Sequence, residues 1–165
     1  MAKKQKYRLS VLLELREKAK QEAERFLGEC LAALKTEEDR LAQMEDELAR
    51  MVSLREARMR EYSEKQMRGD MSAQAMISAN SFIERLKEQE DAQKKAIESQ
   101  KAVIAQREEE VKEARSKLIT ANQDLKALEK HREKWEAKVK RERSIKEEED
   151  LDELAQTIFL NKERD

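Results

Sequence analysis

The 165-residue sequence contains no proline, only two glycines, one cysteine and one histidine. Proline and glycine are the strongest local breaks in a chain, so their scarcity favours long uninterrupted helices. A single cysteine cannot form a disulfide within one chain or a thiolate metal cluster. His131 has no serine, cysteine or second histidine placed to form a catalytic relay, and we interpret it as a solvated surface residue. The scarce residue types therefore argue for helix and against catalysis.

Aromatic residues make up 4% of the chain and hydrophobic residues 38%, against 44% charged residues. Such a chain cannot assemble the layered core of an ordinary domain of its length. The sequence also lacks a glycine-rich phosphate loop and a cluster of metal ligands, so we expect no enzyme activity, no cofactor and no metal. No apolar run approaches the roughly 20 residues that span a bilayer. We therefore expect a cytoplasmic protein without direct membrane insertion, and the net charge of -1 gives no general case for nucleic acid.

Two ladders of apolar residues, each with a spacing of seven, dominate the sequence. The first ladder contains Leu27, Leu34, Leu41 and Leu48, with Ala23, Cys30, Met44 and Met51 at the companion positions. The second contains Ile83, Ile97, Ile104, Val111, Leu118 and Leu125, with Leu86, Ala114, Ala121, Leu128 and Trp135 as companions. Positions a and d of a heptad repeat give this pattern, which predicts the apolar seam of a coiled coil.

The segment between the two ladders has the residues of a chain reversal. Gly69 can adopt the left-handed conformation that closes a helix, and Asp70 or Ser72 can cap the next helix. We therefore predict one all-α domain over residues 1–165, folded as a long two-helix antiparallel coiled-coil hairpin. Helix one is expected over about 11–66 with Ser10 as its N-cap, the turn over 67–72 and helix two over about 73–146. A short helical tail, 147–165, is either continuous with helix two or hinged from it.

The predicted seam closes within one chain, so we expect a monomer in the free state. Polar residues interrupt it, and such residues weaken a coiled coil while fixing its register. The polar seam positions are Glu37, Arg55, Glu90, Gln93, Gln100 and Arg107.

One end of the predicted hairpin is basic. Residues 130–146 hold eight basic side chains against three acidic ones, and the fold brings them beside the basic first residues, which include Lys3, Lys4, Lys6 and Arg8. A solvated helix face is the simplest interpretation. The alternative is a docking end that enters an acidic or carbonyl-lined cavity of a partner and is steered there by charge. Nucleic acid is disfavoured because the acidic residues 147–153 follow directly. The candidate docking residues are Tyr7, Arg8, Trp135, Lys138, Lys140, Arg141 and Arg143.

The other end, around the turn, has more apolar residues than a two-stranded seam can bury. Met59, Tyr62, Met67, Met71, Met76, Ile77 and Phe82 all flank the turn. They form either a local cluster that closes the turn or a second protein-binding surface, since exposed methionine and aromatic side chains are common at such surfaces.

Three segments resemble the signatures of one known family. They are Tyr7-Arg8-Leu9-Ser10-Val11-Leu12-Leu13-Glu14-Leu15-Arg16, the turn Gly69-Asp70-Met71-Ser72 followed by Phe82-Ile83-Glu84-Arg85-Leu86, and Lys134-Trp135-Glu136 leading to Leu151-Asp152-Glu153-Leu154-Ala155. Their order and spacing resemble the FliJ/YscO family of type III export proteins across nearly the whole chain.

The resemblance implies a non-enzymatic central stalk of a flagellar or injectisome export apparatus. Its open end would bind and stimulate a hexameric export ATPase, and its turn would contact the cytoplasmic domain of the membrane export gate through Tyr62, Phe82 and Leu86. Some members bind export chaperones, so an export-chaperone escort is one alternative. A generic coiled-coil spacer that forms a parallel dimer is another, although a parallel coil gains nothing from the turn at Gly69. The resemblance places the protein in the cytoplasm, peripheral to the membrane-embedded apparatus.

Overall fold

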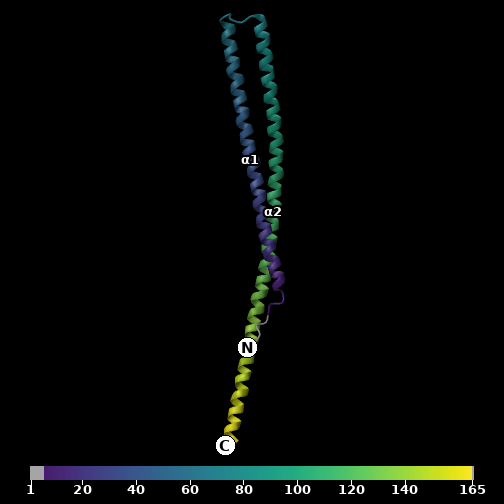
Figure 1. Ribbon diagram of the computed structural model, residues 1–165, viewed down its shortest axis with the longest axis vertical. Helices are drawn as coiled ribbons and strands as arrows, with labels where there is room; N and C mark the ends of the chain where they lie inside the picture. Colours follow the sequence, from purple (N-terminus) through teal and green to yellow (C-terminus); the bar gives the residue numbers. More distant parts are fainter. Residues whose placement is uncertain (1–5, 165) are drawn as a thin grey trace. The chain divides into compact units, whose positions relative to one another are not determined.

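The computed structural model describes residues 6–164, which form two helices and no strand. Helix α1 runs from Ser10 to Met67 and helix α2 from Ala73 to Arg164 (Figure 1). The predicted all-α pair of long helices is confirmed. The predicted tail lies within α2 up to Arg164, so it is continuous with helix two. Lys3 and Lys4 of the expected basic lead-in lie outside the described residues.

The described residues form two compact units, and both helices contribute to each. One unit comprises residues 25–115 and contains the turn; we call it the turn unit. The other comprises the residues up to 24 and those from 116 onward, and we call it the terminal unit.

The turn closes α1 with a hydrogen-bonded motif that requires glycine. Gly69 has a φ of 71°, in the left-handed region. The amide of Gly69 donates to the carbonyl of Gln66 at 3.1 Å and that of Asp70 to the carbonyl of Lys65 at 3.0 Å, the pair of bonds that defines a Schellman motif. Helix α2 then starts with Ser72 as N-cap, because its hydroxyl accepts the Ala75 amide at 3.1 Å.

The start of α1 differs from the prediction. Ser10 is the first residue of the helix and not its N-cap, because the first i to i+4 bond runs from the Leu13 amide to the Leu9 carbonyl at 2.9 Å. Leu9 therefore occupies the cap position without a side chain that can accept a hydrogen bond.

The predicted seam is the core of the structure. Every residue of the two ladders is buried or half-buried. In the turn unit Cys30, Val111 and the fully buried Ala114 form a cluster, and Leu27 and Leu34 pack against it. Leu13 and Leu125 are buried in the terminal unit. There Arg16 and Asp124 connect the two helices by an ion pair of 3.3 Å.

Five of the six polar seam residues have partners across the helix pair, whereas Arg107 pairs with Glu110 of its own helix at 3.0 Å. Arg55 donates from Nε to both carboxylate oxygens of Glu90, at 2.8 and 3.0 Å. The amide of Gln100 donates to the Glu37 carbonyl at 3.0 Å, and that of Gln93 to the Met44 carbonyl at 3.0 Å. Side-chain polar atoms that are buried in the described chain all have a partner. These bonds fix which residue of α1 faces which residue of α2.

Candidate docking surfaces

An aromatic cluster anchors the first described residues to α2 in the terminal unit. Tyr7 is only 7% exposed, and its ring centroid lies 5.2 Å from that of Trp135 and 5.8 Å from that of His131. The Tyr7 hydroxyl and Nδ1 of His131 share a hydrogen bond. The interpretation of His131 as a solvated surface residue did not include this contact with Tyr7. The sequence signals the contact only through the predicted pairing of the two ends of the chain, which brings residue 7 to the level of residues 131–135.

A groove of about 570 Å³ lies beside this cluster. Tyr7, Trp135 and Val139 supply its apolar side chains, and Arg132, Lys140 and Arg143 supply positive charge; Glu136 completes the lining. Arg132 is neutralised by an ion pair of 3.1 Å with Glu136. Lys140 and Arg143, in contrast, form no ion pair with any residue that the structure describes. The groove thus combines aromatic surface with two uncompensated cations.

Three of the predicted docking residues, Arg8, Lys138 and Arg141, are exposed and do not line the groove. Tyr7 lines it but is only 7% exposed, so it offers a partner little surface. The structure therefore brings Tyr7, Trp135, Lys140 and Arg143 together at one groove and leaves the other three outside its lining.

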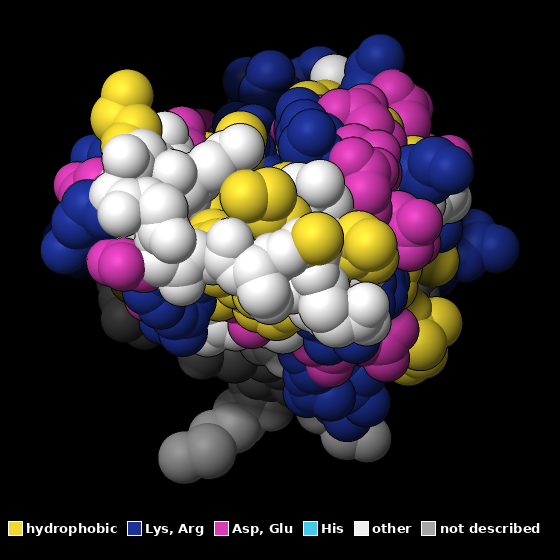
Figure 2. All heavy atoms as spheres, turned by 90° about the horizontal axis from the view of Figure 1, so that it is seen from above, with side chains coloured by type: hydrophobic (Ala, Val, Ile, Leu, Met, Phe, Trp, Pro, Cys, Tyr) yellow, Lys and Arg dark blue, Asp and Glu magenta, His cyan; other side chains and the backbone are white. Residues whose placement is uncertain are grey.

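The turn unit carries the predicted apolar tip. Met67 is 88% and Ile77 60% exposed, and Met59 is also exposed. Figure 2, which looks onto the turn, shows hydrophobic side chains at the surface with Lys, Arg, Asp and Glu around them. A groove of about 320 Å³ lies here, lined by Tyr62, Lys65, Asp70, Met71, Ala75, Ser78 and Ala79. Tyr62 is half-buried and presents one side to this groove.

Charges near the tip are largely compensated. Glu61 pairs with Arg58 at 3.0 Å and with Lys65 at 3.5 Å. The hydrogen bond from Arg58, followed by that from Lys65, lowers the pKa of Glu61 below its usual value of 4.5. The Arg85 guanidinium lies 5.8 Å from the centroid of the half-buried Phe82 ring, within cation–π range. The tip therefore offers apolar contact more than net charge.

Leu86 is not part of the tip surface. It is 8% exposed and belongs to the buried seam with Ala79 and Ile83. The second heptad ladder already contains Leu86, so the sequence pattern that predicts the seam also identifies this residue as core. A partner could reach it only if the two helices separated.

The described residues contain no group of three or more histidine, cysteine, aspartate or glutamate side chains that could hold a metal ion. Neither helix, as far as the structure describes it, has a stretch long and apolar enough to cross a membrane. Both surfaces are open grooves: one lies between Tyr7 and α2, the other is formed by α1, the turn and α2. Such open grooves are suited to binding another protein.

Comparison with known proteins places this geometry in a family. The model of the YscO-like protein family matches residues 4–165. The chain belongs to the YscO-like family. This member has a fold similar to the solved structure of CT670 from Chlamydia trachomatis, described as a proposed YscO homolog. The TM-score is 0.83 with 19% sequence identity, over 98% of this chain and 99% of that one. No curated protein matches the chain. Family membership connects this YscO-like protein to type III export.

Proposed function

We propose that this protein is the non-enzymatic central stalk of a type III export apparatus. In this proposal the basic surface of the terminal unit binds and stimulates a hexameric export ATPase. The tip of the turn unit contacts the cytoplasmic domain of the export gate. The protein would act in the cytoplasm, peripheral to the membrane-embedded apparatus, and without a cofactor.

The groove beside Tyr7 carries the proposal. Lys140 and Arg143 line it without an ion-pair partner in the described chain, next to the ring of Trp135. An aromatic side chain flanked by free cations is typical of a protein interface that an acidic partner occupies. A face that served only to keep the helix soluble would not need an apolar groove.

The ATPase interaction is tested by reversing Lys138, Lys140, Arg141 and Arg143 to glutamate. The affinity for a purified export ATPase should fall by about 100-fold or more, and stimulation of the ATPase should fall with it, because several charges are reversed at one interface. A matched control reverses four exposed residues of the turn unit, Lys94, Lys95, Lys112 and Arg115, and makes the same change in total charge. The control should bind nearly as the wild type. Equal loss in both variants would show a non-specific charge effect, and no loss in either would refute ATPase docking at this surface.

The gate interaction is tested separately at the tip. Replacing Tyr62 and Phe82 with alanine should weaken binding of the purified gate domain while ATPase stimulation persists. The two half-buried rings contribute contact area beside the exposed Met67 and Ile77. If both binding activities and the thermal midpoint fell together, these rings would be structural only.

An export-chaperone escort remains the second candidate, because the apolar tip could equally receive a chaperone. The same Tyr62 and Phe82 variant distinguishes the two, according to whether gate or chaperone binding is lost. The parallel-dimer spacer loses its basis, because the seam of the turn unit is filled by the two helices of one chain.

A further inference from the structure

The last part of α2 carries a second heptad pattern on a different face. The buried ladder ends at Trp135 and Val139, and its next positions are occupied by Glu142, Lys146 and Glu149. A new ladder begins before that point. It consists of Ala137, Ser144 and Leu151 at intervals of seven, continued by Ile158, with Lys140, Glu147 and Leu154 three residues after the first three.

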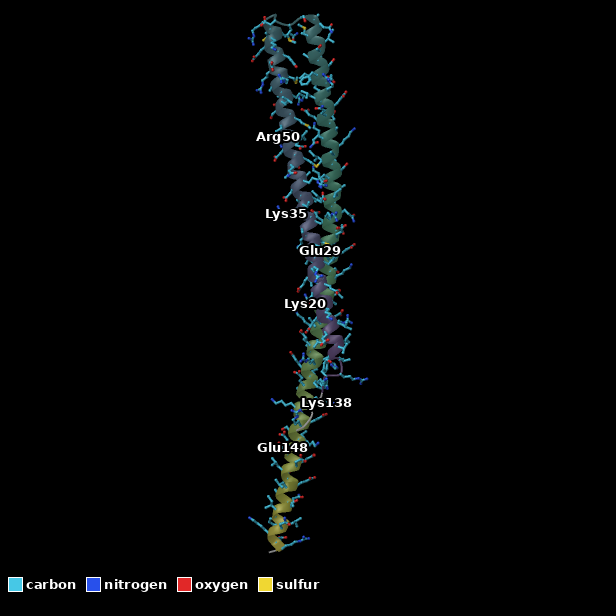
Figure 3. All side chains as sticks on the ribbon, in the orientation of Figure 1. Lys20, Glu29, Lys35, Arg50, Lys138 and Glu148 are labelled. Atoms are coloured by element: carbon cyan, nitrogen blue, oxygen red, sulfur yellow. The ribbon has the colours of Figure 1, made fainter. Side chains whose placement is uncertain are left out.

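This new ladder has no partner in the described chain. All residues from Lys140 to Arg164 are exposed. Leu151 is 65% exposed, Leu154 57% and Ile158 52%. Figure 3 shows Lys138 and Glu148 on this part of α2, where the ribbon of α1 does not lie alongside. A heptad seam on a lone helix is a face that another helix can cover.

Charge changes sign in the middle of the same segment. Residues 138–146 contain five basic side chains and one acidic side chain, whereas residues 147–153 contain six acidic side chains and no basic one. A helix with this distribution is complementary to itself when a second copy lies antiparallel. In a parallel pair, like charges would face each other.

We propose that residues 137–154 of α2 form an antiparallel two-fold dimer with the same segment of a second copy. Antiparallel coiled coils place a positions opposite d positions. In the register with its two-fold axis between Ile145 and Lys146, Ala137 faces the partner's Leu154 and Lys140 faces the partner's Leu151. Small or flexible side chains then face large apolar ones, and this arrangement lets a seam interdigitate. The contact is closed, because each copy offers the same patch.

The residues that flank the seam, at positions e and g of each heptad, select this register. Position e brings Arg141 opposite Glu148 of the partner subunit, and position g brings Arg143 opposite Asp150 of the partner subunit. The two-fold symmetry repeats both pairs. None of these four side chains forms an ion pair within the described chain. A shift of the dimer by one heptad in either direction brings like charges together, Arg141 with its symmetry mate or Asp150 with its own.

The dimer is a property of the terminal unit and does not depend on the proposed export function. The seam within the hairpin led to the expectation of a free monomer, but it concerns a different face of α2. Because Ser144, Glu147 and Lys140 occupy positions in the new seam, the association is weak and depends on concentration. Pairing also neutralises Arg141 and Arg143, so the dimer offers fewer cations to an acidic partner than the monomer does.

Sedimentation velocity of the full chain, without any ATPase, tests the proposal. One variant carries Arg141→Glu and Arg143→Glu, and the other carries Glu148→Arg and Asp150→Arg. Each alone should dimerise about 100-fold more weakly than the wild type, because like charges then face each other. An equal mixture of the two should dimerise again, since every facing pair in the mixed dimer has opposite charges. A wild type that stays monomeric at every concentration, or a mixture that fails to associate, would overturn the proposal.

Crosslinking tests the orientation. In a Cys30→Ala background, a mixture of the Ser144→Cys and Glu147→Cys proteins should oxidise to the mixed disulfide, because these positions face each other across the dimer. Neither protein should crosslink with itself to a comparable extent. Preferential self-crosslinking of each variant would indicate a parallel pair and refute the antiparallel one. Circular dichroism of every variant confirms that the helices are retained.

Discussion

Helix α2 contains two heptad ladders that differ in what surrounds them. Ile97, Val111 and Leu125 of the buried ladder are each 6% exposed, whereas Leu151 and Leu154 of the new ladder at 137–158 are more than half exposed. The spacing of seven is the same in both, although the new ladder is more polar, with Lys140, Ser144 and Glu147 in its seam. Only the buried ladder has α1 beside it. A heptad pattern therefore predicts a face that requires a partner, and the fold decides whether the same chain supplies it.

The largest expected effect comes from placing a charge in the buried ladder. Val111→Asp puts a carboxylate into the cluster of Cys30 and Ala114, whose members offer no charged partner. Burial of an unpaired charge should lower the free energy of unfolding by about 4 kcal/mol. Thermal and urea unfolding followed by circular dichroism measure the change. A loss close to zero would mean that the seam opens readily around this position.

A smaller effect is expected from the buried ion pair of the turn unit. Arg55→Met leaves the Glu90 carboxylate, 5% exposed, without its partner. The free energy of unfolding should fall by about 2–3 kcal/mol, and adding Glu90→Leu should restore most of it, because the cost lies in the orphaned charge. Lys35→Met breaks the exposed pair with Asp39 and serves as control, with no measurable change expected. If the double variant were as unstable as the single one, the pair would stabilise by packing instead.

The two glycines should respond with opposite signs to the same substitution. A Cβ atom would meet nothing within 4 Å at either position, so only backbone conformation matters. Gly69→Ala forces alanine into a φ of 71° and should destabilise the protein by about 1 kcal/mol. Gly28→Ala, inside α1, should stabilise it by about 1 kcal/mol. Urea unfolding of both variants provides the comparison, and equal signs would contradict the assignment of Gly69 as the helix stop.

The smallest effect on folding is expected from Leu151→Asp. Leu151 is exposed, so its replacement should change the free energy of unfolding of the dilute protein by no more than about 0.5 kcal/mol. The same variant should lose self-association in sedimentation experiments. A large loss of stability at low concentration would show that this ladder packs against its own chain.

The ladders and the turn could be predicted from the sequence because each depends on local spacing. Leucine at intervals of seven and a single glycine between two such runs require no knowledge of distant residues. The ion pair of Arg55 with Glu90 could not be predicted in the same way. Both residues were recognised as polar seam positions, but their pairing depends on the register between two helices, and a shift of one heptad changes every partner.

The candidate surfaces also could be predicted only as far as they depend on local sequence. The charges of residues 138–143 follow directly from the sequence, whereas the groove beside Tyr7 depends on how the first residues lie against α2. Leu86 was assigned to the tip by resemblance, although its place in the ladder made it a core residue. Where a local pattern and a resemblance disagree about burial, the pattern was the better guide here.

The burial of Cys30 gives the protein an intrinsic reporter. It is the only thiol in the chain, is 7% exposed and packs against Val111 and Ala114 of the facing helix. A thiol reagent can react with it only during moments when the two helices separate locally. When reclosing is faster than the chemical reaction, the modification rate measures the population of that open state. The unmodified protein can therefore reveal, by a colorimetric assay alone, whether a bound partner tightens or loosens the helix pair.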